Sequence, residues 1–210
     1  MEMVTELYRT VAEKVYGTRV FKIKEFNIDV DAEWERYDFC ELIKKEFSID
    51  PLSTTVEEVR TVLEDKGLEC DQKSFNLERG VDTLWKQIRK TLSGPGFLIG
   101  VPVYLEPLAK RSSKDERVVE RFQVILGGSE MGKGYSELND PIDQAERFKH
   151  QQELRDAGDD EAQMNDASYV EALEYGMPPA LGFGVSERLF SFFEGVSIRE
   201  AQIFPLLRPK

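Results

Sequence analysis

The stretch Ser93-Gly94-Pro95-Gly96 restricts the fold more than any other feature, because the hydrophobic pattern changes there. Before it, most apolar residues recur at the spacing of three and four residues that is typical of amphipathic helices. After it, short apolar or alternating runs are separated by glycine turns, which indicates strands. Consecutive glycine and proline residues interrupt regular structure. The chain is therefore predicted to join a mainly helical part to a sheet-forming part.

The first part is predicted to hold four helices and one pair of short strands. The clearest helix follows Thr55, which forms a capping-box pattern with Glu58, and ends at Gly67. The remaining elements are helices over 4–15, 37–47 and 84–92, and strands over Val20–Ile23 and Phe26–Val30, joined by a tight turn.

The second part is predicted to be built around a β-hairpin. Gly127-Gly128 is the expected two-residue turn between Arg121–Leu126 and Ser129–Glu137. Further strands are expected at 97–101 and 182–186, an extended segment at 102–108, and helices at 140–156, at 166–175 and from Glu187. We therefore expect one α+β domain over 1–210, with a helical flank at 1–95 and an antiparallel sheet flanked by helices at 96–210.

Charge and composition exclude several classes of protein. Lys and Arg number 28 against 40 Asp and Glu, so the net charge of −12 argues against a self-sufficient nucleic-acid binder. Two cysteines and one histidine exclude a disulfide framework and a four-ligand zinc site, and no nucleophile motif lies near His150. No apolar run approaches the roughly 20 residues that span a bilayer, so a cytoplasmic protein without membrane contact is expected.

The hairpin carries the first group of candidate site residues. Period-two alternation places Lys133, Tyr135 and Glu137 on one face, and Gln123 with Glu130 on the other. Carboxylate oxygens beside glycines suit Mg²⁺ and a closely approaching ligand. The alternative is a solvated edge hairpin whose glycines form bulges.

The second group lies where a glycine-bearing strand runs into the last long helix. Gly182 and Gly184 would let a flat ligand lie on the strand, and Arg188 could cover it. The segment lacks the third glycine of a dinucleotide fingerprint. The alternative to a ligand site is that this segment only packs a strand against a helix. The acidic run 159–161 is expected to be solvent-exposed.

Several longer motifs resemble class II lysyl-tRNA synthetases in order and spacing. The resembling segments are Met3–Gly17, Glu106–Arg111, Gly127–Glu130, Tyr135–Gln144, Ala157–Ala162, Glu174–Pro179, Arg188-Leu189, Ser197–Glu200 and Ile203–Pro205.

The resemblance implies an antiparallel class II catalytic fold. It also implies that this fold activates an amino acid, with lysine as the expected one, by means of ATP and Mg²⁺ and transfers it to tRNA. By the family's pattern, Glu130 would hold Mg²⁺ on the ATP phosphates. Tyr135 and Glu137 would line the lysine pocket. Arg188 would lie against the adenine, with Gly182 and Gly184 on its strand. Glu130 and Arg188 are thus the expected catalytic residues.

Departures from the family pattern shape what is expected of this chain. The family's first and second signature motifs and its anticodon-binding domain are expected to be missing from this chain. The isolated chain should therefore be a weak catalyst that reaches tRNA only with further domains or chains. Exposed apolar surface and a homodimer or complementing chain are expected as well. Gln123 replaces a metal carboxylate, which weakens that metal position, and Lys133 replaces an asparagine in the substrate pocket. The lysine could bind a carboxylate or phosphate, or repel the substrate lysine.

Two further expectations can be tested. Strict alternation separates Glu130 from Glu137, so a shared cleft requires a bulge or twist near Gly132–Gly134. Three functions remain open: a synthetase catalytic domain, an impaired paralogue that binds ATP, adenylate or a partner chain as a regulatory module, and an amino-acid-activating enzyme that does not act on tRNA.

Overall fold

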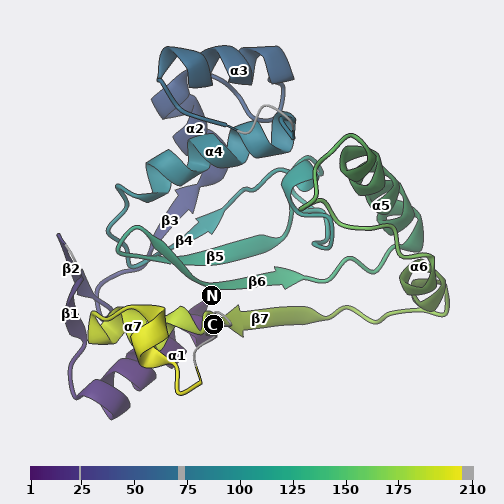
Figure 1. The fold of residues 1–210 in the computed structure, drawn as a ribbon. Coiled ribbons are helices and arrows are strands. Elements are labelled where there is room, and N and C mark those ends of the chain that lie inside the picture. Colours follow the sequence, from purple (N-terminus) through teal and green to yellow (C-terminus); the bar gives the residue numbers. More distant parts are fainter. Residues whose placement is uncertain (24, 71–73, 205–210) are drawn as a thin grey trace, which may run out of the picture.

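The computed structural model describes residues 1–23, 25–70 and 74–204, and a five-stranded sheet lies at its centre (Figure 1). The strand order is β3-β4-β5-β6-β7. These strands are β3 (Glu35–Asp38), β4 (Gly96–Ile99), β5 (Arg121–Leu126), β6 (Ser129–Ser136) and β7 (Leu181–Val185), and a separate hairpin pairs β1 (Val20–Ile23) with β2 (Phe26–Asp29).

Helices surround the sheet on both faces and at one end. In chain order they are α1 (Glu2–Val11), which continues as a π-helix over Ala12–Tyr16, α2 (Phe39–Phe47), α3 (Val56–Asp65), α4 (Leu77–Arg89), a 3-10 turn over Val103–Leu105, α5 (Pro141–Asp156), α6 (Ala167–Glu174), α7 (Arg188–Glu194) and α8 (Ile198–Ala201).

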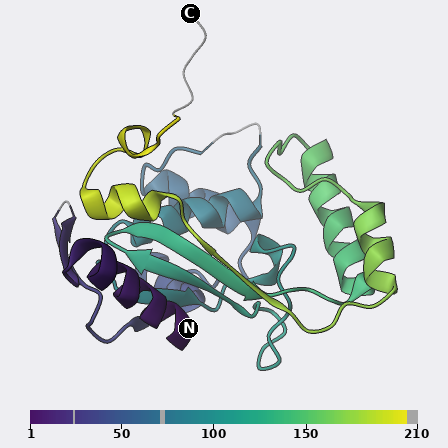
Figure 2. The ribbon, with the colours of Figure 1, turned by 90° about the horizontal axis from the view of Figure 1, so that it is seen from below.

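The pleat of the sheet divides the core into two hydrophobic clusters. In β5, Ile125 packs with residues of α2, α3 and α4, whereas its neighbours Val124 and Leu126 pack with α1, the β1–β2 hairpin and α7. Successive side chains of a strand point to opposite faces, so this alternation follows directly from the apolar run in β5. Figure 1 shows α2 to α4 above the strands and α1 with α7 below them, and in the view from below α5 and α6 lie apart at one end of the sheet (Figure 2).

The expectation of a purely antiparallel sheet is wrong, because β3 pairs with β4 in parallel. The chain is a mixed α+β fold in which β4 to β7 form the antiparallel part. The sequence pattern predicts that residues 37 and 38 belong to a helix, and this prediction is wrong. The helix instead begins at Phe39, because the Asp38 side chain caps it by accepting the Glu41 amide hydrogen. The predicted helical flank thus also supplies one strand of the sheet.

Several local predictions are confirmed and others need correction. Thr55 and Glu58 form both bonds of the capping box, and Gly67 follows α3 at φ +63°. The segment after Pro102 is not fully extended but makes one 3-10 turn, which begins at the proline carbonyl and so needs no proline N–H. The turn residue at position 24 and the last residue of the motif 203–205 lie outside the described part of the chain.

The hairpin β5–β6 contains the predicted bulge, at a slightly different place. A two-residue turn at Gly127-Gly128 predicts that Glu130 pairs with Ile125, as it does, and that Gly132 pairs with Gln123, but Gly132 pairs with Val124 instead. Met131 is therefore the extra residue, and its side chain enters the cluster on the opposite face. Because of the bulge, Glu130 lies on the same face as Lys133, Tyr135 and Glu137.

The helices α5 and α6 pack against each other at the end of β6 and β7 (Figure 1). Asp140 caps α5, and Pro141 occupies its first turn, as the sequence indicates. None of the helices in the described part of the chain combines the length and the apolar character that a bilayer span requires.

Candidate functional site

A cavity of about 480 Å³ lies over β6 and β7 on the sheet face that carries α2 to α4. Seven of the eight site residues predicted from the sequence line it, namely Gln123, Glu130, Lys133, Tyr135, Glu137, Gly182 and Gly184. We call it the strand cavity. The Met131 bulge is what brings Glu130 to this side, so the cavity depends on the irregularity in the hairpin.

The two glycines of β7 give the strand cavity its floor. Gly182 pairs with Tyr135, and Gly184 with Lys133. A Cβ on Gly182 would lie 2.8 Å from Glu137 Oε1, whereas a Cβ on Gly184 would meet nothing within 4 Å. The space above Gly182 is therefore filled by the Glu137 carboxylate, whereas the space above Gly184 is open to a flat group.

Arg188 is the one predicted site residue that does not line this cavity. It is exposed at the start of α7, and its backbone N–H donates to Ser186 Oγ at 3.2 Å. Ser186 itself lines the cavity. Arg188 thus lies two residues beyond the cavity wall, and among the described residues no side-chain hydrogen bond or ion pair holds its guanidinium elsewhere.

Glu130 is held by two side chains of α4. Its Oε1 accepts the indole N–H of Trp85 at 2.9 Å and lies 3.1 Å from Arg89 Nη1. Burial alone would raise the pKa of Glu130, but these hydrogen bonds and the Arg89 charge outweigh it and lower the pKa. The carboxylate is therefore charged and oriented by α4 before any ligand arrives.

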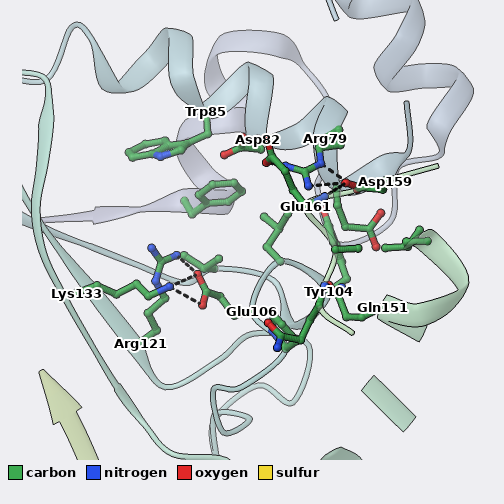
Figure 3. A pocket seen from close by; sticks show the side chains of 18 of the residues that line it. Arg79, Asp82, Trp85, Tyr104, Glu106, Arg121, Lys133, Gln151, Asp159 and Glu161 are labelled. Atoms are coloured by element: carbon green, nitrogen blue, oxygen red, sulfur yellow. Dashed lines mark hydrogen bonds and ion pairs between the residues drawn. The ribbon is translucent and has the colours of Figure 1, made fainter. Parts of the chain in front are cut away.

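A second cavity of about 380 Å³ adjoins the first and extends toward α4 and the loop after α5 (Figure 3). We call it the helix cavity. It shares Gln123, Glu130 and Lys133 with the strand cavity. Where the two meet, the Glu106 carboxylate binds both Arg121 Nη1 at 2.9 Å and Lys133 Nζ at 3.1 Å.

The donors at the predicted metal position form an incomplete set. Glu130 Oε1 is engaged, and Gln123 Oε1 accepts from Arg121. Within the residues that the structure describes, no three His, Cys, Asp or Glu side chains cluster as metal ligands. Mg²⁺ is usually held by one or two carboxylates together with phosphates of the substrate. The residues therefore fit a Mg²⁺ ion that a nucleotide carries in, with Glu130 as its protein carboxylate.

Glu137 lies at the other end of the strand cavity from the Glu106 cluster. Among the described residues its carboxylate forms no ion pair, in contrast to Glu106 and Glu130. Burial raises the pKa of Tyr135, and the Glu137 charge raises it further. This site thus presents one half-buried phenol and one uncompensated carboxylate side by side.

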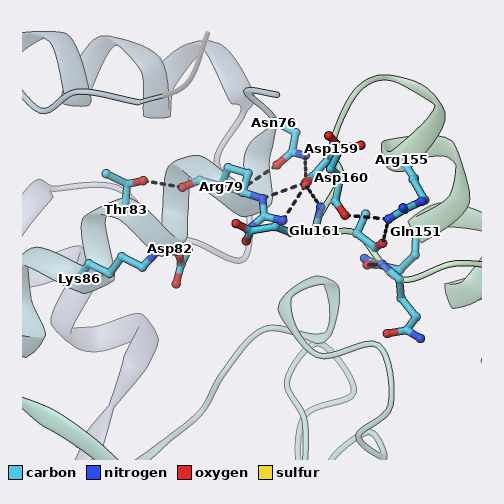
Figure 4. Close-up of polar contacts among 12 residues, drawn as sticks. Asn76, Arg79, Asp82, Thr83, Lys86, Gln151, Arg155, Asp159, Asp160 and Glu161 are labelled. Carbon is cyan, nitrogen blue, oxygen red and sulfur yellow. Dashed lines mark hydrogen bonds and ion pairs between the residues drawn. The ribbon is translucent and has the colours of Figure 1, made fainter. Parts of the chain in front are cut away.

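The helix cavity is bordered by a buried polar cluster that the sequence does not reveal (Figure 4). Asp159, which was expected to be solvent-exposed, is buried and accepts from Arg79 Nη2 at 2.6 Å and from Asn76 at 2.8 Å. Arg79 also pairs with Glu161. The hydrogen bond with Arg79 is the main reason that the pKa of Asp159 is lowered. This cluster joins α4 to the loop after α5.

Sequence reasoning missed four residues that shape the site: Trp85, Arg89, Glu106 and Arg121. The first two belong to a helix predicted only from its apolar spacing, and nothing in that spacing indicates a contact with Glu130. A partial signal existed for Arg121, because it begins the strand that carries Gln123 and has the same alternation parity.

Fold and site together define a class of protein, and comparison with known families agrees. A family model described as tRNA synthetases class II (D, K and N) matches residues 1–208. The chain therefore belongs to this family, and the resemblance seen in its motifs is confirmed.

Within the family, the similar relatives are named lysine–tRNA ligase. Those of Thermosipho africanus, Thermotoga maritima and Bacillus subtilis are 40%, 38% and 36% identical over the whole of this chain. The chain spans less than half the length of these relatives, 42% in the first two and 43% in the third.

Proposed function

We propose that this chain holds ATP and an amino acid, with lysine as the expected one, for the formation of an aminoacyl-adenylate, whose aminoacyl group is then transferred to a tRNA hydroxyl while AMP leaves. In the first of these steps a carboxylate oxygen of the amino acid bonds to the α-phosphorus of ATP, and pyrophosphate leaves. The names of the relatives, lysine–tRNA ligase, support this choice of substrates. The family membership supports the reaction class.

The observation that carries the proposal is the uncompensated Glu137 carboxylate in the strand cavity. A charged group that is partly removed from water gains most from a partner of opposite sign. The side-chain ammonium of lysine is such a partner, and the Tyr135 ring beside it gives an apolar wall for the methylene chain. Glu137 would therefore select a cationic amino acid.

The nucleotide is assigned to the floor of the strand cavity, which β7 forms. The open space over Gly184 accommodates a flat base, and Arg188 at the start of α7 would cover it and face a phosphate. Glu130 would contribute one oxygen to Mg²⁺ carried by the phosphates, and the ion would neutralise phosphate charge. In this scheme catalysis consists of positioning and charge neutralisation, which needs no histidine.

The experiment is amino-acid-dependent ATP–pyrophosphate exchange by the purified chain, with Glu137→Gln beside Glu171→Gln as the control. Glu171 is an exposed residue of α6 that lies outside the strand cavity. We expect lysine-dependent exchange that falls at least tenfold in Glu137→Gln, which is the loss expected for a charged hydrogen bond. Equal exchange in both variants would contradict the role of Glu137.

One observation favours a second candidate, a regulatory module that binds ATP or an adenylate without turnover. The oxygen of Gln123 and one oxygen of Glu130 are already bound to protein groups, so this site neutralises phosphate charge less well than two free carboxylates with metal. Measurable ATP binding with no exchange would support this module. Exchange without charging of tRNA would instead indicate an amino-acid-activating enzyme with another acceptor. The net charge of −12 predicts weak tRNA binding by this chain in either case.

A further inference from the structure

Two cations share one carboxylate where the strand cavity and the helix cavity meet. Glu106 has 12% of its side chain exposed, and it binds Arg121 on one side and Lys133 on the other. One negative and two positive charges leave a net charge of 2 − 1 = +1 in this cluster. Figure 3 shows both cations directed at the same carboxylate.

The groups around this cluster do not neutralise the excess charge. Glu130 is paired with Arg89, and Gln123, the direct cross-strand neighbour of Lys133, is neutral. Gln123 Oε1 accepts from Arg121, but the Arg121 Nε is buried without a hydrogen-bond partner among the described residues. A buried cation with an unused donor beside a cavity favours an anionic ligand there.

The two cations differ in what they can reach. Arg121 has 8% of its side chain exposed, so the surrounding protein fixes it. Lys133 has 43% exposed, lines both cavities and lies 5.7 Å from the centre of the Tyr135 ring. Lys133 is therefore the group that a ligand would touch, and Arg121 is a positioning residue that keeps Glu106 from cancelling the lysine charge.

We infer that Lys133, supported by Arg121 and Glu106, forms an anion subsite that takes a carboxylate or phosphate group of the bound ligand. This inference rests on the proposed function, because it assigns one group of that ligand. Glu137 lies four residues further along the extended chain, directly after the end of β6, about 13 Å away at 3.3 Å per residue. The site thus offers a negative end and a positive end, which would align an amino acid or its adenylate in one direction only.

The test compares Lys133→Gln and Lys133→Arg with Lys86→Gln. Lys86 is a matched control, since it is a half-exposed lysine that is paired with Asp82 and lines neither of the two cavities. Binding to the purified chain is measured by calorimetry with inorganic pyrophosphate, ATP, adenosine, lysine and lysinamide. Fluorescence of Trp85, which contacts Glu130, gives a second readout.

We expect Lys133→Gln to weaken pyrophosphate binding about tenfold or more, and Lys133→Arg and Lys86→Gln to retain it. A loss for ATP but not for adenosine identifies the phosphate as the bound group. A loss for lysine but not for lysinamide identifies the carboxylate. Lys133→Gln binding pyrophosphate, ATP and lysine as tightly as the unmodified chain would overturn the inference, as would an unmodified chain that binds none of the three.

The two proposals fail separately in this experiment. Pyrophosphate binding that depends on Lys133, in a chain that binds neither ATP nor lysine, would leave the subsite standing and contradict the proposed function. ATP and lysine binding that are both independent of Lys133 would leave the proposed function standing and refute the subsite.

Discussion

Glu137 and Gly182 lie against each other across β6 and β7, and this contact sets the position of the proposed recognition carboxylate. Gly182→Ala would place a Cβ 2.8 Å from Glu137 Oε1 and push that carboxylate aside. The contact is with the far end of a side chain, so the fold should accept the change. We predict a lysine affinity lower by about tenfold, the size of one charged hydrogen bond, as measured by calorimetry.

Gly184→Ala is the matched control, because its added Cβ meets nothing within 4 Å. It should leave lysine binding intact and weaken the binding of the nucleotide that is assigned to the open space over Gly184. Loss of lysine affinity in both variants alike would show that the strand, rather than the Glu137 carboxylate, governs recognition.

The charge of Glu130 makes stability depend on pH. Its folded-state pKa lies below the ordinary 4.5, so its stabilising contribution is fully present above about pH 4.5 and is lost as the pH falls through the lowered value. We predict that Glu130→Gln lowers the free energy of unfolding by about 2 kcal/mol at pH 7, because Arg89 loses its partly buried partner.

Urea denaturation at several pH values measures this difference. The gap between the two proteins should narrow below pH 4.5, since protonation removes the same charge from the unmodified chain. A gap that stays constant down to pH 3.5 would contradict the assignment of this contribution to the charge of Glu130.

At this scale the sequence predicts residues on one strand well and partners from distant elements poorly. Alternation and the glycine pattern identified Lys133, Tyr135 and Glu137 as one face, and the structure keeps them there. Trp85 and Arg89 lie more than 40 positions from Glu130, so only the packing of α4 over the sheet brings them close.

The link between α4 and the loop after α5 depends on Asp159. Its carboxylate accepts from Arg79, Asn76 and the Glu161 amide, and only 4% of its side chain is exposed. Asp159→Asn would remove the buried one of the two carboxylates that pair with Arg79 and leave only the exposed Glu161. We predict a loss of about 3 kcal/mol in the free energy of unfolding, measured by chemical denaturation.

The neighbouring Asp160 provides a matched control, because its side chain is exposed. Asp160→Asn should change stability by less than about 0.5 kcal/mol. A small effect of Asp159→Asn would show that the ion pairs across the helix cavity are dispensable and that apolar packing holds these elements together.

Among the elements, those with local signals were predictable and those that depend on pairing were not. The capping-box pattern of Thr55 and Glu58 predicts α3, and the Gly127-Gly128 turn predicts the hairpin. The strand β3 has four residues, three of them charged, and it exists because β4 pairs with it in parallel. A segment of four residues is too short to show the hydrophobic alternation by which a strand is recognised, so the sequence does not indicate this pairing.

For the whole molecule, net charge opposes the association that its apolar surface favours. Large apolar side chains are exposed on α1, where Met3 is 74% exposed, and on α7, where Phe190 is 51% exposed. The net charge of −12 produces repulsion between copies. Repulsion between exposed charges weakens once the Debye length falls to about 3 Å near 1 M salt, whereas apolar contacts persist.

We therefore predict that the chain is largely monomeric at low ionic strength and self-associates as salt is added, as measured by sedimentation velocity. Phe190→Ser should reduce the association at high salt. Tyr175→Ser is the control, because Tyr175 is an equally large, 87% exposed aromatic residue beside α6, at the other end of the molecule. Association that decreases with salt would mean that ion pairs, and not the apolar side chains of α1 and α7, join the copies, and equal effects of the two substitutions would remove α7 from the interface.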